Sequence, residues 1–472
     1  MFERAAYAER RRQLKRQFSS GLLLLLGNTD VSINYPHNHY WFRQDSSFSY
    51  FFGLNQPDLA AVIDIDADLD TLFGDDASLD DVIWVGPQVS FAERASTVGV
   101  DTVKPYQELA AVITAAQRQN RTIHYLPPYR GESVLELARL FACAPEQIKP
   151  GISQSFIQAV VALREIKSAQ EINEIERTLA VTRDMHIAAM RLAKPDAFEY
   201  QIVAAMEGIM RSHDLQSAYP MIFSRSGEIL HNRDHHQRLR AGDLVVNDSG
   251  ASSALGYASD ITRTIPVGGR FSELQRALYE IVLGAQQHAI NAMRPGVPYL
   301  QIHKLAAAYL VAGMSELGFF HGTPEQVVES GAYAICFPHG LGHQMGLDVH
   351  DMEALGENQV GYDVHVKRSD LFGLRNLRLA KTLRAGMVVT VEPGIYFIPE
   401  LIKRWQTEGR HSELIDYARF AEFMDFGGIR IEDNVLVTES AARVLGPAIP
   451  KTCAEIEALM AGAEKGGGVQ TD

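Results

Sequence analysis

Short apolar runs alternate with amphipathic stretches through roughly the first third of the chain. Four of these runs are predicted strands, at residues 22–26, 61–65, 82–85 and 123–126. Between them, residues 106–119 and 133–142 have the spacing of apolar positions that is typical of helices with one buried face. The Asp-rich stretch at residues 66–81 is predicted to be an exposed loop. The alternation predicts an α/β domain with a central sheet.

The spacing changes near Lys167, where longer helical patterns begin. Ser168 followed three residues later by Glu171 is a capping-box signature, and it predicts a helix that starts at residue 169. Beyond it, helices are predicted at residues 169–192, 199–212, 272–293 and 299–317, and strands around Met221, Leu244 and Tyr257. We therefore predict a domain boundary after residue 165 and an α+β domain over residues 166–472, whose end, residues 465–472, is a frayed tail.

An eleven-residue segment occurs twice in this second domain. Residues 240–250 (RAGDLVVNDSG) recur as residues 384–394 (RAGMVVTVEPG), and each copy has a carboxylate, Asp248 or Glu392, two positions before its last glycine. The apolar run in each copy predicts a buried strand that ends in an inward-facing acid. A further carboxylate follows each copy, Asp260 after the first and Glu432 after the second. The repeat predicts a pseudo-two-fold domain whose halves share one site.

Four inward-facing carboxylates repel one another unless a positive charge lies among them. Metal ions are the simplest source of that charge. The segment between the two copies, FPHGLGHQMGLDVHD, contains His339, His343 and His350, which can supply a nitrogen ligand. The spacing of His339 and His343 alone is more often structural than metal-binding. His235 and His236 stand among charged residues and are interpreted as part of a solvated loop.

Composition narrows the possible functions. The chain has 472 residues, of which 46% are hydrophobic, so it is long enough for two or three folded domains. A net charge of -14 repels phosphate backbones and anionic lipid, which argues against a nucleic-acid or membrane-surface role. Its three cysteines, Cys143, Cys336 and Cys453, have no paired spacing, which favours a reducing cytoplasm. The apolar run at residues 22–26 is too short for a signal or membrane segment.

Five of these residues, in their order and local contexts, resemble the ligand set of the pita-bread metallopeptidases: Asp248, Asp260, His343, Glu392 and Glu432. The similarity is specific to the aminopeptidase P and prolidase branch. It extends to FRQDSSFSYFFGLNQPD at residues 42–58 and to IPKTCAEIEALMAG near the C-terminus, and so covers most of the chain. The resemblance implies a creatinase/aminopeptidase P-like α/β domain over residues 1–165 and a catalytic pita-bread domain over residues 166–472.

The resemblance also implies two divalent ions. In that family pattern Asp260 and Glu432 bridge both ions, Asp248 binds one, and His343 with Glu392 binds the other. Oxygen-rich ligands with one nitrogen suit Mn²⁺ or Co²⁺ better than Zn²⁺, although Zn²⁺ is also compatible. Glu392 matches the position that shuttles the proton of the metal-bridging water.

Other residues match family positions around the substrate. His231, His339 and His350 match histidines that hold the substrate carbonyl and stabilise the tetrahedral intermediate. Strand alternation puts Arg430 on the same face as Glu432, where it can orient that side of the site. Two further substrate contacts are implied: Tyr219, which matches a site-lining tyrosine, and Arg378, which matches the arginine that captures a dipeptide carboxylate in prolidases.

The resemblance implies an Xaa-Pro aminopeptidase, which removes the residue before a proline by means of the metal-bridged water. An Xaa-Pro dipeptidase is the alternative. A non-catalytic binding protein on the same fold is less favoured, because such relatives lose ligands and all five are present here. A hydrolase of phosphotriesters is a third possibility as a side activity. The expected partner is a small peptide with proline in second position, and the family implies a homo-oligomer, either dimer or tetramer.

Overall fold

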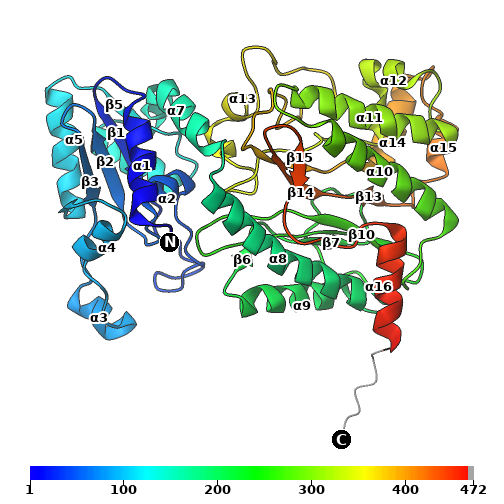
Figure 1. Ribbon diagram of the computed structural model, residues 1–472, viewed down its shortest axis with the longest axis horizontal. Coiled ribbons are helices and arrows are strands. Elements are labelled where there is room, and N and C mark those ends of the chain that lie inside the picture. Colours follow the sequence, from blue (N-terminus) through cyan, green and yellow to red (C-terminus); the bar gives the residue numbers. More distant parts are fainter. Residues whose placement is uncertain (466–472) are drawn as a thin grey trace, which may run out of the picture. The chain divides into compact units, whose positions relative to one another are not determined.

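The structure is a computed structural model, in which residues 1–465 are described (Figure 1). Most of the predicted frayed tail, from residue 466 onward, lies outside the described residues. The chain divides into two compact units. The N-terminal unit comprises residues 1–165 together with residues 352–359, and the C-terminal unit comprises residues 166–351 and the described chain from residue 360.

One mixed sheet forms the centre of the N-terminal unit, with strand order β4-β3-β2-β1-β5. Its strands are β1 (Leu22–Leu26), β2 (Ala60–Asp64), β3 (Leu69–Phe73), β4 (Thr102–Lys104) and β5 (Ile123–Tyr125). β1 pairs antiparallel with β2 and parallel with β5, while β3 pairs parallel with β4. The predicted strands at residues 22–26, 61–65 and 123–126 are therefore confirmed.

Helices enclose this sheet. They are α1 (Arg4–Lys15), α2 (Ser46–Phe52), α3 (Leu79–Val85), α4 (Phe91–Thr97), α5 (Leu109–Arg118), α6 (Gly131–Phe141) and α7 (Gln154–Arg164). Alternate residues of β1, Leu22 and Leu24, share a core with Leu109 of α5 and Leu137 of α6. Because strand side chains alternate between faces, this pattern puts α5 and α6 on one face of the sheet.

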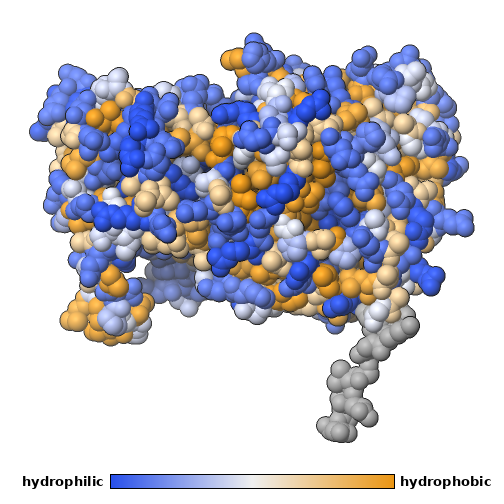
Figure 2. Space-filling view, viewed as in Figure 1, coloured by the Kyte–Doolittle hydropathy of each residue, from blue (hydrophilic) through white to orange (hydrophobic). Residues whose placement is uncertain are grey.

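Two predictions in this unit are wrong. The predicted loop at residues 66–81 contains β3, because a short LDTLF run between the Asp-rich turns supplies a strand whose Leu72 and Phe73 are buried. The predicted strand at residues 82–85 lies in α3, where a capping box of Ser78 and Asp81 starts a helix instead. None of the residues of α3, all of which are described, is buried. The hydrophobic surface at the lower left of Figure 2 lies over this helix, where Trp84 is 83% exposed.

The C-terminal unit follows the predicted order of long helices and short strands. Its helices are α8 (Ala169–Leu192), α9 (Glu199–Ser212), α10 (Glu273–Ala292), α11 (Tyr299–Glu316), α12 (Pro324–Ser330), α14 (Pro399–Glu408), α15 (Tyr417–Ala421) and α16 (Cys453–Lys465), and α13 (Glu357–Val360) spans the junction at residue 360. The predicted limits of α8 and α9 are confirmed, and α10 and α11 begin and end within one residue of the prediction. Ser168 and Glu171 form the predicted capping box.

The strands of this unit lie in several small sheets. They are β6 (Gln216–Ser217), β7 (Ile222–Ser224), β8 (Leu244–Asp248), β9 (Ala251–Ser252), β10 (Thr262–Pro266), β11 (Val388–Val391), β12 (Gly394–Tyr396), β13 (Gly428–Arg430), β14 (Asp433–Val437) and β15 (Ala442–Val444). β8 lies between β10 and β7, and β14 lies between β11 and β15. The strand predicted around Tyr257 is wrong, because only an isolated bridge at Ala258 occurs there and the strand begins at Thr262.

The sequence repeat is also a repeat in structure. In the first half the N–H of Asp196, between α8 and α9, donates to the carbonyl of Leu239 at 2.9 Å. In the second half the N–H of Gly296, between α10 and α11, donates to the carbonyl of Leu383 at the same distance. Leu239 and Leu383 each stand directly before a repeated segment, so each helix pair is joined to its own pair of strands in the same way. The antiparallel strand pairs β8–β10 and β11–β14 are the matching pairs.

No helix within the described residues 1–465 is long and apolar enough to cross a membrane.

Candidate active site and metal centre

One cavity of about 350 Å³ in the C-terminal unit is lined by residues from both halves of the repeat. Every residue that the sequence singled out for metal binding, catalysis or substrate binding lines it: Asp248, Asp260, His343, Glu392, Glu432, His231, His339, His350, Tyr219, Arg378 and Arg430. Its volume is near the lower end of the range of about 300 to 1,000 Å³ for small-molecule sites. The cavity therefore suits a small ligand.

Two strands of the first half position Asp248 and Asp260. Asp248 is the last residue of β8, and it pairs in register with Thr262, which starts β10 two residues after Asp260. The backbone N–H of Asp260 donates to Asn434 Oδ1 at 3.0 Å. The Tyr219 hydroxyl lies 2.5 Å from Asp248 Oδ1 and 2.5 Å from Asp260 Oδ1. Its one proton can be donated to only one of these carboxylates at a time.

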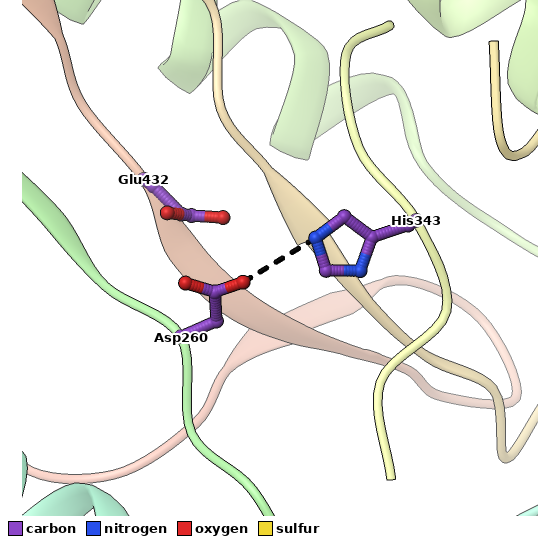
Figure 3. A group of neighbouring side chains, drawn as sticks. All are labelled: Asp260, His343 and Glu432. Atoms are coloured by element: carbon purple, nitrogen blue, oxygen red, sulfur yellow. Dashed lines mark ion pairs between the residues drawn. The ribbon is translucent and has the colours of Figure 1, made fainter. Parts of the chain in front are cut away.

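Asp260, Glu432 and His343 converge on a common point, with ligand atoms that lie within 4.8 Å of one another (Figure 3). Glu432 directly precedes β14, and its N–H donates to the carbonyl of Thr262 at 3.1 Å, which joins the two halves. The Thr262 hydroxyl donates to Glu432 Oε2 at 2.8 Å. His343 Nε2 lies 3.3 Å from Asp260 Oδ2. All three residues are buried.

Glu392 follows β11 in the same way that Asp248 ends β8. Its N–H donates to the carbonyl of Leu341 at 2.8 Å, and its Oε1 lies 3.6 Å from His343 Nε2. Thr390, two residues earlier, accepts the His343 N–H at 3.1 Å and has its hydroxyl 3.5 Å from Glu392 Oε1. Thr390 therefore positions both the backbone of His343 and the carboxylate of Glu392.

Burial and mutual repulsion disfavour the charged forms of these acids. The pKa of Asp260 is raised well above its usual value by burial and by the charge of Asp248. Burial raises the pKa of Glu392 in the same way, with the charge of Glu432 adding to it, and the pKa of Glu432 is raised by burial and the charge of Asp260. Acids in this state gain strongly from a cation bound among them.

The raised pKa values of the buried acids indicate that these side chains fit divalent cations. Carboxylate oxygens with one imidazole nitrogen and no thiolate are ligands for metal ions that prefer oxygen donors. Of the five predicted ligands, Asp260, His343 and Glu432 form the tight group, while Asp248 and Glu392 line the same cavity. The side-chain arrangement can therefore hold divalent metal.

Arg430 connects these acids to His339 through Tyr396. Its Nη2 donates to Asp248 Oδ2 at 2.6 Å and its Nη1 donates to the Tyr396 hydroxyl at 2.9 Å, while that hydroxyl lies 2.8 Å from His339 Nε2. His339 Nδ1 donates to the carbonyl of Gly340 at 2.8 Å, so its Nε2 is the acceptor for the Tyr396 hydroxyl. Burial, followed by the Arg430 charge, lowers the pKa of His339 to about 3. The neutral His339 ring must exchange one of these bonds to contact a substrate.

The remaining predicted residues, His231, His350 and Arg378, also line the cavity. Burial, followed by the Arg430 charge, lowers the pKa of His231, which keeps this ring neutral at pH 7. The rings of His343 and His350 meet edge to face with centroids 4.4 Å apart. Arg378 lines the wall together with Asn376. Neutral imidazoles and a guanidinium can donate to carbonyl and carboxylate oxygens respectively.

Sequence reasoning missed three residues that orient this site: Thr262, Thr390 and Tyr396. A usable signal existed for the first two, because strand alternation puts Thr262 on the face of Asp260 and Thr390 on the face of Glu392. Tyr396 had no such signal, since it meets His339 and Arg430 only through the pairing of β12 with β13.

A glycine next to His343 gives a prediction about the site's tolerance to substitution. A Cβ atom at Gly342 would lie 2.0 Å from the backbone oxygen of Thr390. Gly342→Ala is therefore expected to lower the free energy of unfolding of this unit by about 3 kcal/mol, because neither backbone can yield without moving His343 or β11. Thermal unfolding followed by circular dichroism measures this change.

Gly208→Ala is the matched control for this prediction. Gly208 lies inside α9, and a Cβ there would meet no atom within 4 Å. The control is expected to leave stability equal or higher by up to about 1 kcal/mol, as alanine favours a helix over glycine. Equal melting points for the two variants would contradict the role assigned to Gly342.

Two family models match the chain. The model for metallopeptidase family M24 matches residues 173–439, and the model for the aminopeptidase P N-terminal domain matches residues 7–124. The first model alone covers more than half of the chain and includes all five candidate ligands.

Sequence relatives and solved structures agree with these models. The chain is 31% identical to a human Xaa-Pro dipeptidase over 98% of this chain and 93% of the relative, and 30% identical to a Haemophilus influenzae Xaa-Pro aminopeptidase over 96% of each. It is similar to Pseudomonas aeruginosa aminopeptidase PepP, with a TM-score of 0.81, 28% identity and coverage of 98% of this chain and 99% of that one. The structure of Escherichia coli aminopeptidase P with the inhibitor Pro-Leu gives a TM-score of 0.80, 27% identity and the same coverage.

A duplicated α+β domain with a buried site of acids and one imidazole, preceded by an α/β domain, defines a pita-bread metallopeptidase, and the predicted fold class is confirmed. The chain belongs to metallopeptidase family M24, in the branch of aminopeptidase P and prolidase. The family and the buried Asp, His and Glu group identify divalent metal ions as its cofactors.

Proposed function

We propose that this chain is an exopeptidase that hydrolyses the bond between an N-terminal residue and a following proline. The observation that carries this proposal is the convergence of five potential metal ligands, three histidines and Arg378 in one small cavity. Proline lacks a backbone N–H and has a fixed φ. A peptidase that binds the N–H of the residue after the scissile bond therefore cannot bind a substrate with proline there. A cavity with imidazoles and a guanidinium can instead read the carbonyl groups and the chain end.

Each side chain has a proposed role. Asp248, Asp260, His343, Glu392 and Glu432 would hold two divalent ions, with Mn²⁺ the favoured metal because of the oxygen-rich ligands and Co²⁺ or Zn²⁺ also compatible. When bound, such ions supply Lewis acidity that polarises the scissile carbonyl and lowers the pKa of water. Glu392 accepts the proton of the attacking water on a carboxylate oxygen and returns it to the proline nitrogen.

The histidines and Arg430 complete the proposed mechanism. His231 and His350 donate to the substrate carbonyl as negative charge develops on its oxygen. His339 does the same through its Nδ1–H once that group releases the carbonyl of Gly340, because Nε2 carries no proton in this state. Arg430, through its bond to Asp248 Oδ2, holds that carboxylate in position. Tyr219, whose hydroxyl lies 2.5 Å from Asp248 Oδ1 and from Asp260 Oδ1, lines the cavity and is a proposed substrate contact.

We also propose the substrates and the location of the protein. The substrates are small peptides with proline in second position, and the location is the cytoplasm. A homo-oligomer, dimer or tetramer, is proposed from the family resemblance alone.

The test uses the full-length protein loaded with Mn²⁺ and three peptides: an Xaa-Pro dipeptide, an Xaa-Pro-Yaa tripeptide and a tripeptide with alanine in place of proline. Release of the first residue from the proline peptides and not from the alanine peptide is the expected result. Turnover of no proline peptide would refute the proposal, and binding of about two metal ions without hydrolysis would support a non-catalytic binding protein instead.

A second candidate, an Xaa-Pro dipeptidase, is favoured by one observation: Arg378 lines the same cavity as the potential ligands. A guanidinium there can bind the carboxylate of a dipeptide. Arg378→Ala is expected to raise KM for the dipeptide about tenfold and to change its kcat little, because the bond is made in both ground and transition states. Steady-state kinetics on dipeptide and tripeptide measure this effect.

Arg375→Ala is the control, since Arg375 belongs to the same segment and lies over the Phe372 ring at 5.0 Å. It is expected to retain wild-type kinetics. Unchanged dipeptide kinetics in Arg378→Ala would show that the carboxylate is bound elsewhere.

A further inference from the structure

A second arginine, Arg233, lines the same cavity on the loop that carries His231. The residue between them, Asn232, is turned the other way: its Nδ2 donates to Ser224 Oγ at 2.9 Å and its Oδ1 accepts the N–H of Asp234 at 3.0 Å. Asn232 is thus tied to the end of β7 while its two neighbours face the cavity. The position of Arg233 is therefore fixed by the hydrogen bonds of Asn232, and not by any hydrogen bond of the Arg233 side chain.

The loop is fixed at its base as well. Glu199, a fully buried residue at the start of α9, accepts the N–H of Arg225 on Oε1 at 2.8 Å. The N–H of Glu199 donates to the carbonyl of Gln237 at 3.1 Å, and His235 Nε2 donates to the carbonyl of Met221 at 3.0 Å. Both ends of the loop are therefore joined to α9 and β7, and a guanidinium presented by it has a defined position on the cavity wall.

The Arg233 side chain makes no hydrogen bond or ion pair within residues 1–465. The nearest acid in sequence, Asp234, is used otherwise, since it accepts the N–H of His236 at 3.1 Å. Two nearby arginines are paired: Arg225 with Asp243 at 2.7 Å and Arg238 with Asp196 at 3.1 Å. In a chain with a net charge of -14, an unpaired arginine that faces the active-site cavity is exceptional.

The cavity is consequently polarised. Its buried part holds the carboxylates of Asp248, Asp260 and Glu432, whereas Arg233 and Arg378 add positive charge to its wall. A short peptide is a zwitterion with the same polarity, because its amino group is positive and its free carboxylate is negative. A single arginine can donate two parallel hydrogen bonds to a carboxylate. A second guanidinium offers further N–H donors to the same two oxygens.

We propose that Arg233 is a specificity-determining residue that acts with Arg378 to bind the free C-terminal carboxylate of short Xaa-Pro substrates. This inference rests on the proposed function and names its substrate class as peptides whose carboxylate lies close to the proline. Longer peptides present a neutral amide at this position and gain nothing from the second arginine.

The experiment compares a dipeptide with its C-terminal amide. Arg233→Ala is expected to raise KM about tenfold for an Xaa-Pro dipeptide and less than about twofold for the Xaa-Pro amide, since a hydrogen bond to a charged group is lost only with the free acid. Arg233→Lys is expected to recover part of the loss, because it restores the charge without the planar pair of donors. Arg238→Ala, in the same stretch but outside the cavity lining, is the control.

A binding measurement separates this inference from the proposed function. Titration calorimetry of Mn²⁺-loaded protein with proline and with prolinamide, the second-residue products of an Xaa-Pro dipeptide and of its amide, is expected to show a preference for the free acid that Arg233→Ala reduces about tenfold. Lack of hydrolysis by the wild type, with that preference intact, would overturn the function and leave this inference standing. Equal losses for acid and amide, or no change in either, would overturn the role of Arg233.

Discussion

A His343→Ala variant is expected to lose about 1,000-fold or more in kcat/KM and to bind about one equivalent less of divalent metal than the wild type. His343 is the imidazole of the buried group with Asp260 and Glu432, so its removal leaves an all-carboxylate site with one ligand fewer. Glu392→Ala is expected to be equally inactive, because it removes a proposed ligand and the proposed proton acceptor together. Peptide hydrolysis at saturating Mn²⁺ and metal analysis of the purified variants measure these effects.

His213→Ala is the control for these variants. His213 is exposed at the end of α9 and lies outside the cavity lining. It is expected to keep wild-type kinetics and metal content. A His343→Ala protein that retains both full activity and full metal content would remove the basis for the proposed metal centre.

Chelation of the metal ions is expected to destabilise the C-terminal unit, and by more at pH 8 than at pH 5.5. The pKa values of Asp260, Glu392 and Glu432 are raised by burial in the absence of cations, so the folded chain retains protons that the unfolded chain has released. The stability contributed by these protonated acids is complete below the ordinary carboxyl pKa of about 4 and is lost as pH rises toward the raised values. Bound cations replace the protons and remove that loss.

The expected size of this change in stability follows from the linkage between metal binding and folding. Metal at about 100 times its Kd stabilises the folded state by about 2.7 kcal/mol per site, which corresponds to a rise of about 4 °C in Tm per site for a unit of about 300 residues. Differential scanning calorimetry with EDTA or with Mn²⁺ at the two pH values measures it, and re-addition of Mn²⁺ after chelation tests reversibility. A chelation effect that is the same at both pH values, or larger at pH 5.5, would show that these acids are not what the cations neutralise.

The helices of the C-terminal unit could be predicted from local sequence because local interactions decide where they begin. Ser168 and Glu171 satisfy the first N–H groups of α8 whatever surrounds it, and the structure places the helix start there. The repeated segments were predictable for a related reason: a buried strand that ends in an acid has few alternatives. The short strands were harder, as shown by Tyr257, where pairing partners far away in sequence decide the outcome.

The candidate site could be predicted as a list of residues but not as a set of contacts. The carboxylates and histidines are visible in the motifs, and the structure brings all of them to one cavity. The contacts of Tyr396 depend on the register of β12 with β13, and the position of Arg233 depends on the anchor at Asn232; neither leaves a local pattern. The exposed α3 was mistaken for a strand because its apolar run is too short to show a helical period.

The two halves of the repeat in the C-terminal unit differ at the position of the imidazole ligand. β7 places Ser224 opposite Val246 of the first repeated segment, and the second half places His343 opposite Thr390, which is the equivalent position. The serine side chain has no nitrogen and its hydroxyl already accepts from Asn232, so only the second half supplies an imidazole ligand at this position. Two ions bound here would be chemically inequivalent. They would bind stepwise, and the more weakly bound ion would exchange on its own. Preparations containing two different metals in one molecule would be stable species.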